Sequence, residues 1–339
     1  MGRSLVDLVF FIGRRLLEML PVLLGVIVLT FFFTHFAVAD PCAAWNPHAK
    51  PLVLANCRSF WGFDKPLYVQ FEKYIVGLLQ GNWGTDQSGA QVFPLIAAGI
   101  PETLELVLAA LLIMIVFGIS LGVIAAQYSG RWPDHLVRVF YLSGWAAPTY
   151  LAALLLAIVV GPAFGFPTGG AYSINPPPFP QPTHLSVIDA LLAGNPSYTV
   201  DAIDHLILPA TALAFLNLGI ITRMTRTSML EILPMDFVKG SRMKGLSETR
   251  VIYRHVLRNS LITTTTVLGF TASGLLSSTV VVEEIFRWPG IGKYSFDAIV
   301  TYNFSGTIGV VIVFAVAVVL ANLIADILYG VLDPRVEWR

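Results

Sequence analysis

The sequence predicts an all-α integral membrane protein with about six transmembrane helices. Only 12% of its 339 residues are charged, whereas 55% are hydrophobic. A soluble globular chain carries about 25% charged residues, so this deficit indicates that a bilayer is the solvent. Six long apolar stretches supply the candidate spans: Leu16–Ala39, Thr103–Gln127, Val137–Val160, Leu206–Ile221, Leu261–Val282 and Thr307–Gly330.

The lengths of these stretches support their assignment as spans. A hydrocarbon core about 30 Å thick needs roughly 20 helical residues, and five of the six stretches reach that length. The fourth is shorter, but it continues past Arg223 if that side chain reaches the interface. Because every backbone polar group in lipid needs an internal partner, we expect each stretch to be helical.

The N-terminal stretch has an alternative interpretation as a cleaved signal peptide. Arg14 and Arg15 precede the apolar run, and Ala37 and Ala39 have the spacing of a cleavage site. The run is too long for the apolar region of a signal peptide, which has 7–15 residues. A first transmembrane helix is therefore the favoured interpretation.

The distribution of charge predicts the orientation of the chain. Formal net charge is zero, and no basic or acidic tail suggests a nucleic-acid partner. If both termini are cytoplasmic, 15 of the 21 Lys and Arg residues fall inside. The six outside are Lys50, Arg58, Lys65, Lys73, Arg287 and Lys293. The positive-inside rule favours this orientation.

The spans divide the chain into two parts. Residues 1–100 hold the first helix and an extracytoplasmic segment, and residues 101–339 hold a core of five helices. Pro101 is a suitable first residue for the second span, because proline fits the first helical turn. Cys42 and Cys57, the only cysteines, fall in the outer segment. They are either two free thiols or a disulfide worth roughly 3 kcal/mol.

A second outer connection, residues 161–205, is rich in proline and contains no Lys or Arg. Pro176, Pro177 and Pro178 exclude a long helix there. The connection is either a solvated loop or a segment that docks an outside partner or gates the mouth.

The connection at residues 234–259 is the most informative part of the chain. Pro234 ends the preceding helix, and Asp236 can cap a short helix that Gly245 stops. Ser247 can cap a second helix. We expect the short helix to project Phe237 and Leu246 into the cytoplasm.

The second helix carries a basic stripe. Arg250, Arg254 and Arg258 recur every four residues, opposite an apolar face. Binding of anionic lipid headgroups explains the arginines alone. A rigid lever against a cytoplasmic partner explains both the stripe and the isolated capped helix.

This connection resembles the coupling loop of ABC importer permeases, of the dipeptide/oligopeptide type. The similarity covers residues 236–247 and 254–259; Gly245 matches the glycine of the family pattern. Lys239, Gly240 and Ser241 stand where the general pattern has Glu-Ala-Ala, and Thr263 stands where it has proline. The resemblance extends along nearly all of the chain. It includes Arg14–Leu16, Phe63–Tyr68, Gly81–Gly84, Val282–Phe286, Pro289–Gly292 and Leu332–Arg335.

The resemblance implies a type I ABC importer permease fold in a prokaryotic inner membrane. It implies a heterodimer with a second homologous permease, two ATPase subunits or domains, and an extracytoplasmic substrate-binding protein. ATP and Mg would be held by the ATPases, so this chain needs no cofactor and is no enzyme. The implied mechanism is alternating access, with ATPase contacts by Asp236, Phe237, Lys239, Arg242, Lys244, Gly245, Leu246 and Ser247. Peptides fit the resemblance best as cargo; sugars or oligosaccharides are the alternative.

The fifth span has a stripe of small residues, Gly269, Ser273 and Ser277. Such residues allow close helix packing or line an aqueous path, and we expect a mixture of both.

Other classes of function find little support in the sequence. The stretch 290–293 resembles a phosphate loop, but Tyr294 replaces its Ser or Thr. No metal-ligand spacing or catalytic set is evident. A self-sufficient secondary transporter or channel would need inverted repeats and ion ligands at the midplane, and the sequence shows neither.

Overall fold

The computed structural model describes residues 5–37, 40–46, 48–86, 88–175 and 177–332. Within these ranges the chain is helical, with one isolated bridge between Thr85 and Gln91. The N-terminal helices are α1 (Leu5–Ala37), α2 (Pro41–Trp45), α3 (Pro51–Trp61) and α4 (Leu67–Leu79). The central elements are α5 (Val92–Ile113), η1 (Met114–Gly118), α6 (Ile119–Gln127), α7 (Trp132–Ala146), α8 (Thr149–Leu155), η2 (Leu156–Val160) and α9 (Gly161–Phe164). The remaining elements are α10 (Ser186–Leu192), α11 (Pro196–Ile232), α12 (Asp236–Met243), α13 (Glu248–Arg250), η3 (Val251–Leu257), α14 (Arg258–Ile285), α15 (Ile291–Val300) and α16 (Phe304–Leu332).

The prediction of about six spans is confirmed. Among the described residues, five continuous helices are long and apolar enough to cross a bilayer, and a bent pair makes a sixth if its two parts form one span. The continuous spans are Phe10–Phe36, Val92–Gln127, Pro196–Ile232, Glu248–Ile285 and Phe304–Ile327. The fourth span is longer than expected because Pro209 lies inside α11 and the helix begins at Pro196.

The third span, predicted as one helix over Val137–Val160, is broken. Trp132–Gly144 and Thr149–Phe164 meet at an angle of 107°. Pro148 explains the break, because its ring disfavours a helical conformation at the preceding residue. Ala147 accordingly has an extended backbone with ψ 133°.

The prediction that Pro101 begins the second span is wrong. Helix α5 begins at Val92, and Pro101 lies inside it. Val92 and Ile96 in the additional turns are fully buried against Ile291 and Val310. Burial of each such side chain contributes about 1.5–3 kcal/mol, which offsets the cost of proline within a helix.

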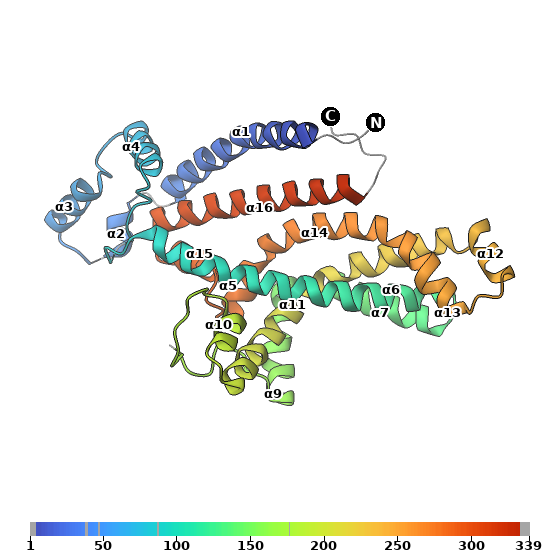
Figure 1. The fold of residues 1–339 in the computed structure, drawn as a ribbon. Coiled ribbons are helices and arrows are strands. Elements are labelled where there is room, and N and C mark those ends of the chain that lie inside the picture. Colours follow the sequence, from blue (N-terminus) through green and yellow to red (C-terminus); the bar gives the residue numbers. More distant parts are fainter. Residues whose placement is uncertain (1–4, 38–39, 47, 87, 176, 333–339) are drawn as a thin grey trace.

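Helices α5, α8, α11 and α14 surround the main core. Close approach of α6 to α11 depends on small residues, since a Cβ on Gly122 would meet Thr222 and Thr225. Helix α1 packs beside α16 and leaves most of its length exposed (Figure 1). Arg15 of α1 pairs with Asp326 of α16 at 3.1 Å.

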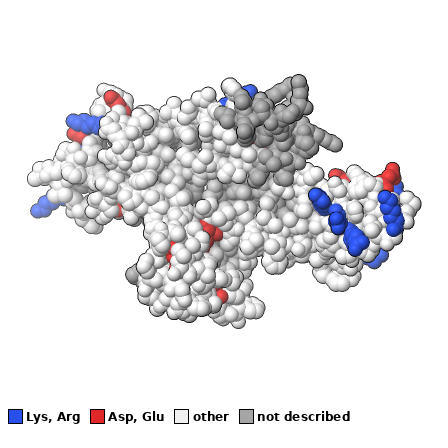
Figure 2. All heavy atoms as spheres, viewed as in Figure 1, with Lys and Arg blue, Asp and Glu red and all other residues white. Residues whose placement is uncertain are grey.

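The molecule has two dissimilar ends, which lie on opposite sides of Figure 1. We call the end with α2–α4 the disulfide end and the opposite one the α12 end. Lys and Arg side chains gather over the α12 end (Figure 2). Residues 165–175 and 177–185 are mostly irregular, as their prolines predict, and form a lobe with α10 (Figure 1). Ala171, Tyr172 and Ala190 of this lobe pack into the main core.

Candidate functional site

The α12 end contains the loop that the sequence singles out. Helix α11 ends at Ile232, before Pro234, and α12 begins at Asp236. The residue at the N-cap position is Met235, so the prediction that Asp236 caps the helix is wrong. Asp236 is the first helical residue, and its exposed carboxylate pairs with the Lys239 ammonium at 3.1 Å. A carboxylate in the first turn still interacts favourably with the helix dipole.

Gly245 ends α12 in the way expected of a helix stop. Its φ is +76°, a left-handed conformation that glycine adopts without strain. The Gly245 amide donates to the Arg242 carbonyl at 2.9 Å, and the Lys244 amide donates to the Gly240 carbonyl at 3.1 Å. These bonds satisfy carbonyl groups that the end of a helix would otherwise leave unpaired.

One face of α12 is anchored to the membrane helices. Val238 is fully buried in a cluster with residues of α6, α11 and η3: Val123, Ala126, Met229, Val251, Ile252 and Val256. Leu246 packs against the same cluster, so the expectation that it projects outward is wrong. This cluster therefore joins α12 to α6, α11 and η3.

The opposite face of α12 is exposed. Phe237 has 45% of its surface accessible and Met243 has 83%. Lys239, Arg242 and Lys244 are exposed around them. Lys239 pairs with Asp236 and Arg242 with Glu248, so exposed apolar side chains lie among ion pairs and the Lys244 cation, a surface suited to a protein partner.

Arg242 also joins α12 to α13. Its guanidinium donates to both carboxylate oxygens of Glu248, at 2.7 and 3.1 Å. This hydrogen bond raises the pKa of Arg242. Ser247 occupies the N-cap position of α13, as predicted, but its side chain makes no capping hydrogen bond.

The segment after α13 differs from the regular helix expected. Val251–Leu257 is π-helical and leads directly into α14. Arg250, Arg254 and Arg258 nevertheless all face outward, opposite the buried apolar residues of the segment. Short π-helical segments inside helices are often found at functional sites.

A buried ion pair lies beneath this surface, and sequence reasoning did not find it. Asp134 at the start of α7 is fully buried. It accepts hydrogen bonds from Arg226 Nε at 2.8 Å, from Arg226 Nη2 at 3.0 Å and from the Gly130 amide at 2.9 Å. The pair fixes α7 to α11 ten residues before α12 begins. An aspartate just after Pro133, on the arginine-rich side, was the available signal.

The disulfide end has its own network around Glu283 of α14. The Glu283 carboxylate accepts from Thr103 Oγ1 at 2.7 Å and from the Lys293 amide at 3.0 Å. Thr103 Oγ1 in turn accepts from the Ile291 amide at 2.9 Å. A Cβ on Gly290 would overlap both Glu283 and Thr103. The stretch that resembled a phosphate loop therefore packs against a carboxylate, and its Ile291 and Lys293 amides already have partners within the chain.

Two further carboxylates hold the α10 lobe. Glu105 of α5 accepts from the amides of Ser186 and Val187 at 2.6 and 2.9 Å, and Glu102 accepts from Ser186 Oγ at 2.7 Å. The lobe is thus attached at the N-terminus of α10. The sequence left two interpretations of the connection at residues 161–205, a solvated loop or a segment that docks a partner or gates the mouth. Ser186 and Asp189 are buried, so a freely solvated loop does not describe the α10 part of this connection.

The three candidate pathway residues on α14 have different surroundings. A Cβ on Gly269 would lie 3.0 Å from the Ala325 side chain of α16. Ser273 is buried and donates to Asn322 Oδ1 at 2.8 Å, whereas Ser277 is exposed. The first two residues therefore serve packing within this chain. A role in a path for any of these three residues stays a prediction.

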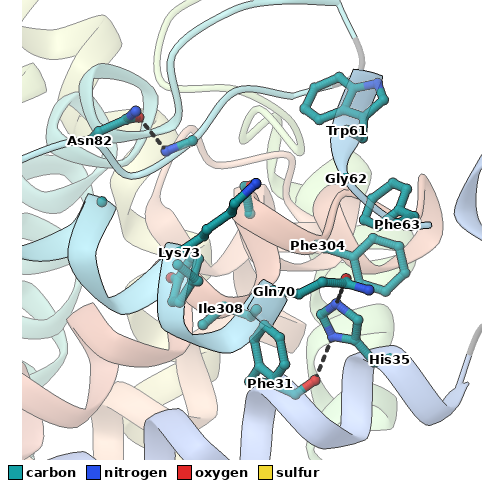
Figure 3. A pocket seen from close by; sticks show the side chains of 14 residues that line it. Phe31, His35, Trp61, Gly62, Phe63, Gln70, Lys73, Asn82, Phe304 and Ile308 are labelled. Atoms are coloured by element: carbon teal, nitrogen blue, oxygen red, sulfur yellow. Dashed lines mark hydrogen bonds between the residues drawn. The ribbon is translucent and has the colours of Figure 1, made fainter. Parts of the chain in front are cut away.

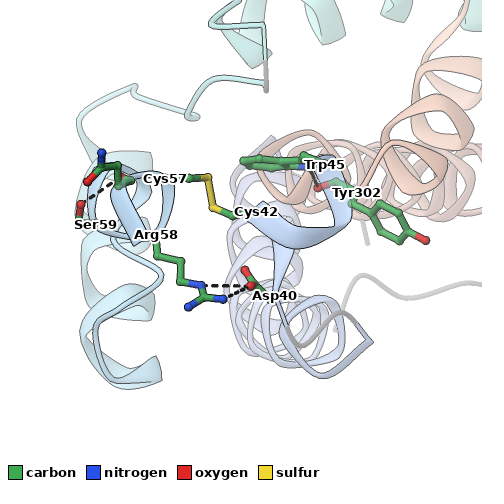
Figure 4. Close-up of a disulfide and its surroundings, with 8 residues drawn as sticks. Asp40, Cys42, Trp45, Cys57, Arg58, Ser59 and Tyr302 are labelled. Carbon is green, nitrogen blue, oxygen red and sulfur yellow. Dashed lines mark hydrogen bonds and ion pairs between the residues drawn. A yellow bond between two sulfur atoms is a disulfide. The ribbon is translucent and has the colours of Figure 1, made fainter. Parts of the chain in front are cut away.

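Cys42 and Cys57 are disulfide-bonded in the structure, with Cα atoms 6.0 Å apart (Figure 4). Arg58 pairs with Asp40 beside the bond and lowers the pKa of that carboxyl. Trp45 Nε1 donates to the Tyr302 carbonyl at 3.2 Å, which ties the segment to the connection before α16. Among the described residues, no group of three or more His, Cys, Asp or Glu side chains could hold a metal ion.

The chain is similar to known proteins along most of its length. Residues 118–338 match the family of binding-protein-dependent transport system inner membrane components, and residues 8–98 match the N-terminal region of such membrane components. Asp333, Pro334 and Arg335, which belong to the C-terminal stretch noted in the sequence, lie outside the described residues.

Curated relatives match over nearly their whole length. The chain is 36% identical to the probable D,D-dipeptide transport system permease protein of Escherichia coli, over 95% of this chain and 96% of that protein. It is 38% identical to the di/tripeptide transport system permease protein of Pseudomonas aeruginosa, over 96% and 98%. It is 34% identical to an oligopeptide transport system permease protein of Bacillus subtilis, over 97% and 99%.

Proposed function

Because the chain belongs to the family of binding-protein-dependent transport system inner membrane components, we propose that it is the permease subunit of an ATP-driven importer of di- or oligopeptides. The observation that carries the cargo class is end-to-end similarity to three peptide permease proteins at 34–38% identity. The multi-pass helical architecture places the protein in the cell membrane.

The proposed orientation puts the α12 end in the cytoplasm, with both chain termini. The basic side chains over this end support it (Figure 2). The disulfide supports it too, since an oxidising exterior favours such bonds.

In the proposed mechanism, the exposed face of α12 contacts an ATPase subunit. Phe237 and Met243 would enter its groove, while Lys239 and Lys244 meet acidic side chains at the rim. The anchored face would pass the displacement to α6, α11 and η3 through Val238. Movement of these helices would open the pathway alternately to the two sides of the membrane.

The proposed assembly contains a second permease, two ATPase subunits or domains and a binding protein. The long exposed side of α1 gives a second membrane subunit room to pack. ATP and Mg would be bound by the ATPases, and the binding protein would deliver peptide at the disulfide end.

Reconstitution tests this function directly. The chain, co-purified with its native partners, is placed in proteoliposomes with the binding protein and a radiolabelled dipeptide outside. We expect uptake with ATP at the α12 side and none with an ion gradient alone. Uptake by the isolated chain under an ion gradient would identify a secondary transporter instead. ATP-dependent uptake of an oligosaccharide but no peptide would refute the cargo and keep the importer.

A further inference from the structure

A pocket at the disulfide end is built for a ligand. It lies where the end of α1, helix α4 and the start of α16 meet, and the residues after α3 close it (Figure 3). Its volume is about 210 Å³. A cavity of about 150 Å³ already accommodates a benzene ring, so this pocket has room for a small organic molecule.

The walls of the pocket are aromatic. The rings of Trp61 and Phe63 are stacked with centroids 6.5 Å apart, and Phe63 meets Phe304 at 5.8 Å. Phe31 stacks on His35 at 4.1 Å, and the His35 ring meets Phe304 at 5.3 Å. These rings come from α1, the end of α3, the α3–α4 connection and α16, so the folded chain creates a surface that favours a flat or apolar group.

Two of the polar side chains in the pocket face groups of the chain itself, and a neutral His35 ring can donate to one of its two oxygen neighbours. His35 Nδ1 lies 2.7 Å from the Phe31 carbonyl oxygen, and Nε2 lies 3.2 Å from Gln70 Oε1. The Gln70 amide nitrogen donates to the Lys65 carbonyl at 2.7 Å. These groups support the wall and have little capacity left for a ligand.

The remaining polar groups are hydrogen-bond donors. Among the described residues, no carboxylate lies within ion-pair distance of the Lys73 ammonium, which extends into the space between Asn82 and Trp61 (Figure 3). The Tyr74 hydroxyl is buried without a partner, and burial raises its pKa, so it remains protonated. Asn82 uses its oxygen to accept from the Gly84 amide at 3.0 Å, which leaves its NH₂ group available.

We propose that this pocket binds an amphiphilic organic anion, with its charged group at Lys73 and its apolar body between the aromatic rings. A cation would be repelled by Lys73, which is exposed at the rim, and a neutral apolar molecule would leave the buried Tyr74 hydroxyl unsatisfied. The same chemistry is offered by a small aromatic carboxylate and by an anionic lipid headgroup with its adjoining chain. The site does not depend on which cargo the protein carries.

The test uses 3-phenylpropanoate and its uncharged amide as matched probes. Binding to the full chain in phosphatidylcholine nanodiscs is measured by saturation-transfer NMR. We expect the carboxylate to bind and the amide to bind about tenfold more weakly, as for loss of one charged hydrogen bond. Lys73→Gln should weaken carboxylate binding about tenfold. Lys50→Gln, which removes an exposed cation from the same end, should leave it unchanged.

Nanodiscs that contain phosphatidylglycerol distinguish the two sources of the anion. Competition with the probe in wild type identifies the lipid headgroup as an occupant, and undiminished probe binding identifies a small carboxylate. Equal binding of carboxylate and amide, or equal loss in Lys73→Gln and Lys50→Gln, would overturn the proposal. Tyr74→Phe, which keeps the ring and removes the donor, should weaken binding severalfold without changing thermal stability.

Discussion

Arg226 of α11 donates two hydrogen bonds, of 2.8 and 3.0 Å, to the fully buried carboxylate of Asp134. Arg138 approaches the same carboxylate at 3.4 Å. One aspartate thus faces two guanidinium groups where α7 meets α11, and its charge balances one of them. Arg226 lies on α11 ten residues before α12, the helix that we propose to receive force, so the pair bears on the position of that end of α11.

Asp134→Ala should therefore destabilise the chain strongly. Removing one partner of a buried pair costs about 3–5 kcal/mol because the other charge remains. We expect about 3 kcal/mol, since Arg226 keeps 20% of its side chain exposed. Unfolding by sodium dodecyl sulfate in mixed micelles measures this loss. Asp64→Ala, at an exposed pair, is the control and should change stability by less than about 0.5 kcal/mol.

Gly245→Ala and Gly240→Ala form a matched pair within the same loop. Alanine at Gly245 would adopt φ +76°, at a cost of about 1–2 kcal/mol. Gly240 lies inside α12 with open space around its Cβ position, so alanine there should stabilise the helix by up to about 1 kcal/mol. Hydrogen exchange of the α12 amides measures both effects. Equal protection in the two variants would contradict the role of Gly245 as the helix stop.

Neighbouring residues Phe237 and Val238 should show opposite phenotypes. Val238 is fully buried, so Val238→Ala should destabilise the chain by about 2 kcal/mol. Phe237 is 45% exposed, so Phe237→Ala should leave the isolated chain nearly unchanged. In the proposed complex, however, it should reduce co-purification of the ATPase at least tenfold. If Phe237→Ala retained full ATPase binding and transport, α12 would not be the contact surface.

The sequence was sufficient to predict the number of spans because length and hydropathy act locally. The sequence was not sufficient to predict where helices begin or break at prolines, because the effect of a proline depends on the residues packed around it. Pro148 breaks a span, while Pro101 and Pro209 lie inside long helices. Val92 and Ile96 show the reason at Pro101: their burial against α15 and α16 stabilises turns that proline alone would disfavour.

The same distinction applies to the candidate site. The role of Gly245 as a helix stop can be predicted from neighbouring residues in the sequence, and in the structure Gly245 has the positive φ that this role requires. The Asp134–Arg226 and Thr103–Glu283 contacts join residues 92 and 180 positions apart. No local pattern reveals such partners, because only the packing of α7 on α11 and of α5 on α14 brings them together.

Gly290→Ala should disrupt the network around Glu283. The new Cβ would overlap the Glu283 carboxylate and the Thr103 hydroxyl, both of which are buried. Overpacking of this kind costs about 1–3 kcal/mol, and we expect the upper part of that range because a buried hydrogen bond is also broken. Gly274→Ala is the control on α14, since nothing lies near its Cβ position. Thermal unfolding in detergent compares the two, and equal stability would show that the connection before α15 adjusts freely.

The disulfide should stabilise the segment after α3, which closes the pocket that we propose to bind an organic anion. It joins Cys42 to Cys57 across a sequence separation of 15, and closing such a loop contributes about 3 kcal/mol. Cys42→Ser with Cys57→Ser should increase proteolysis within α2 and α3 and lower the affinity for 3-phenylpropanoate, because Trp61 follows directly in α3. The α12 end is remote from the bond, so hydrogen exchange of α12 should stay as in wild type. Loss of protection at both ends together would show that the two ends unfold as one unit.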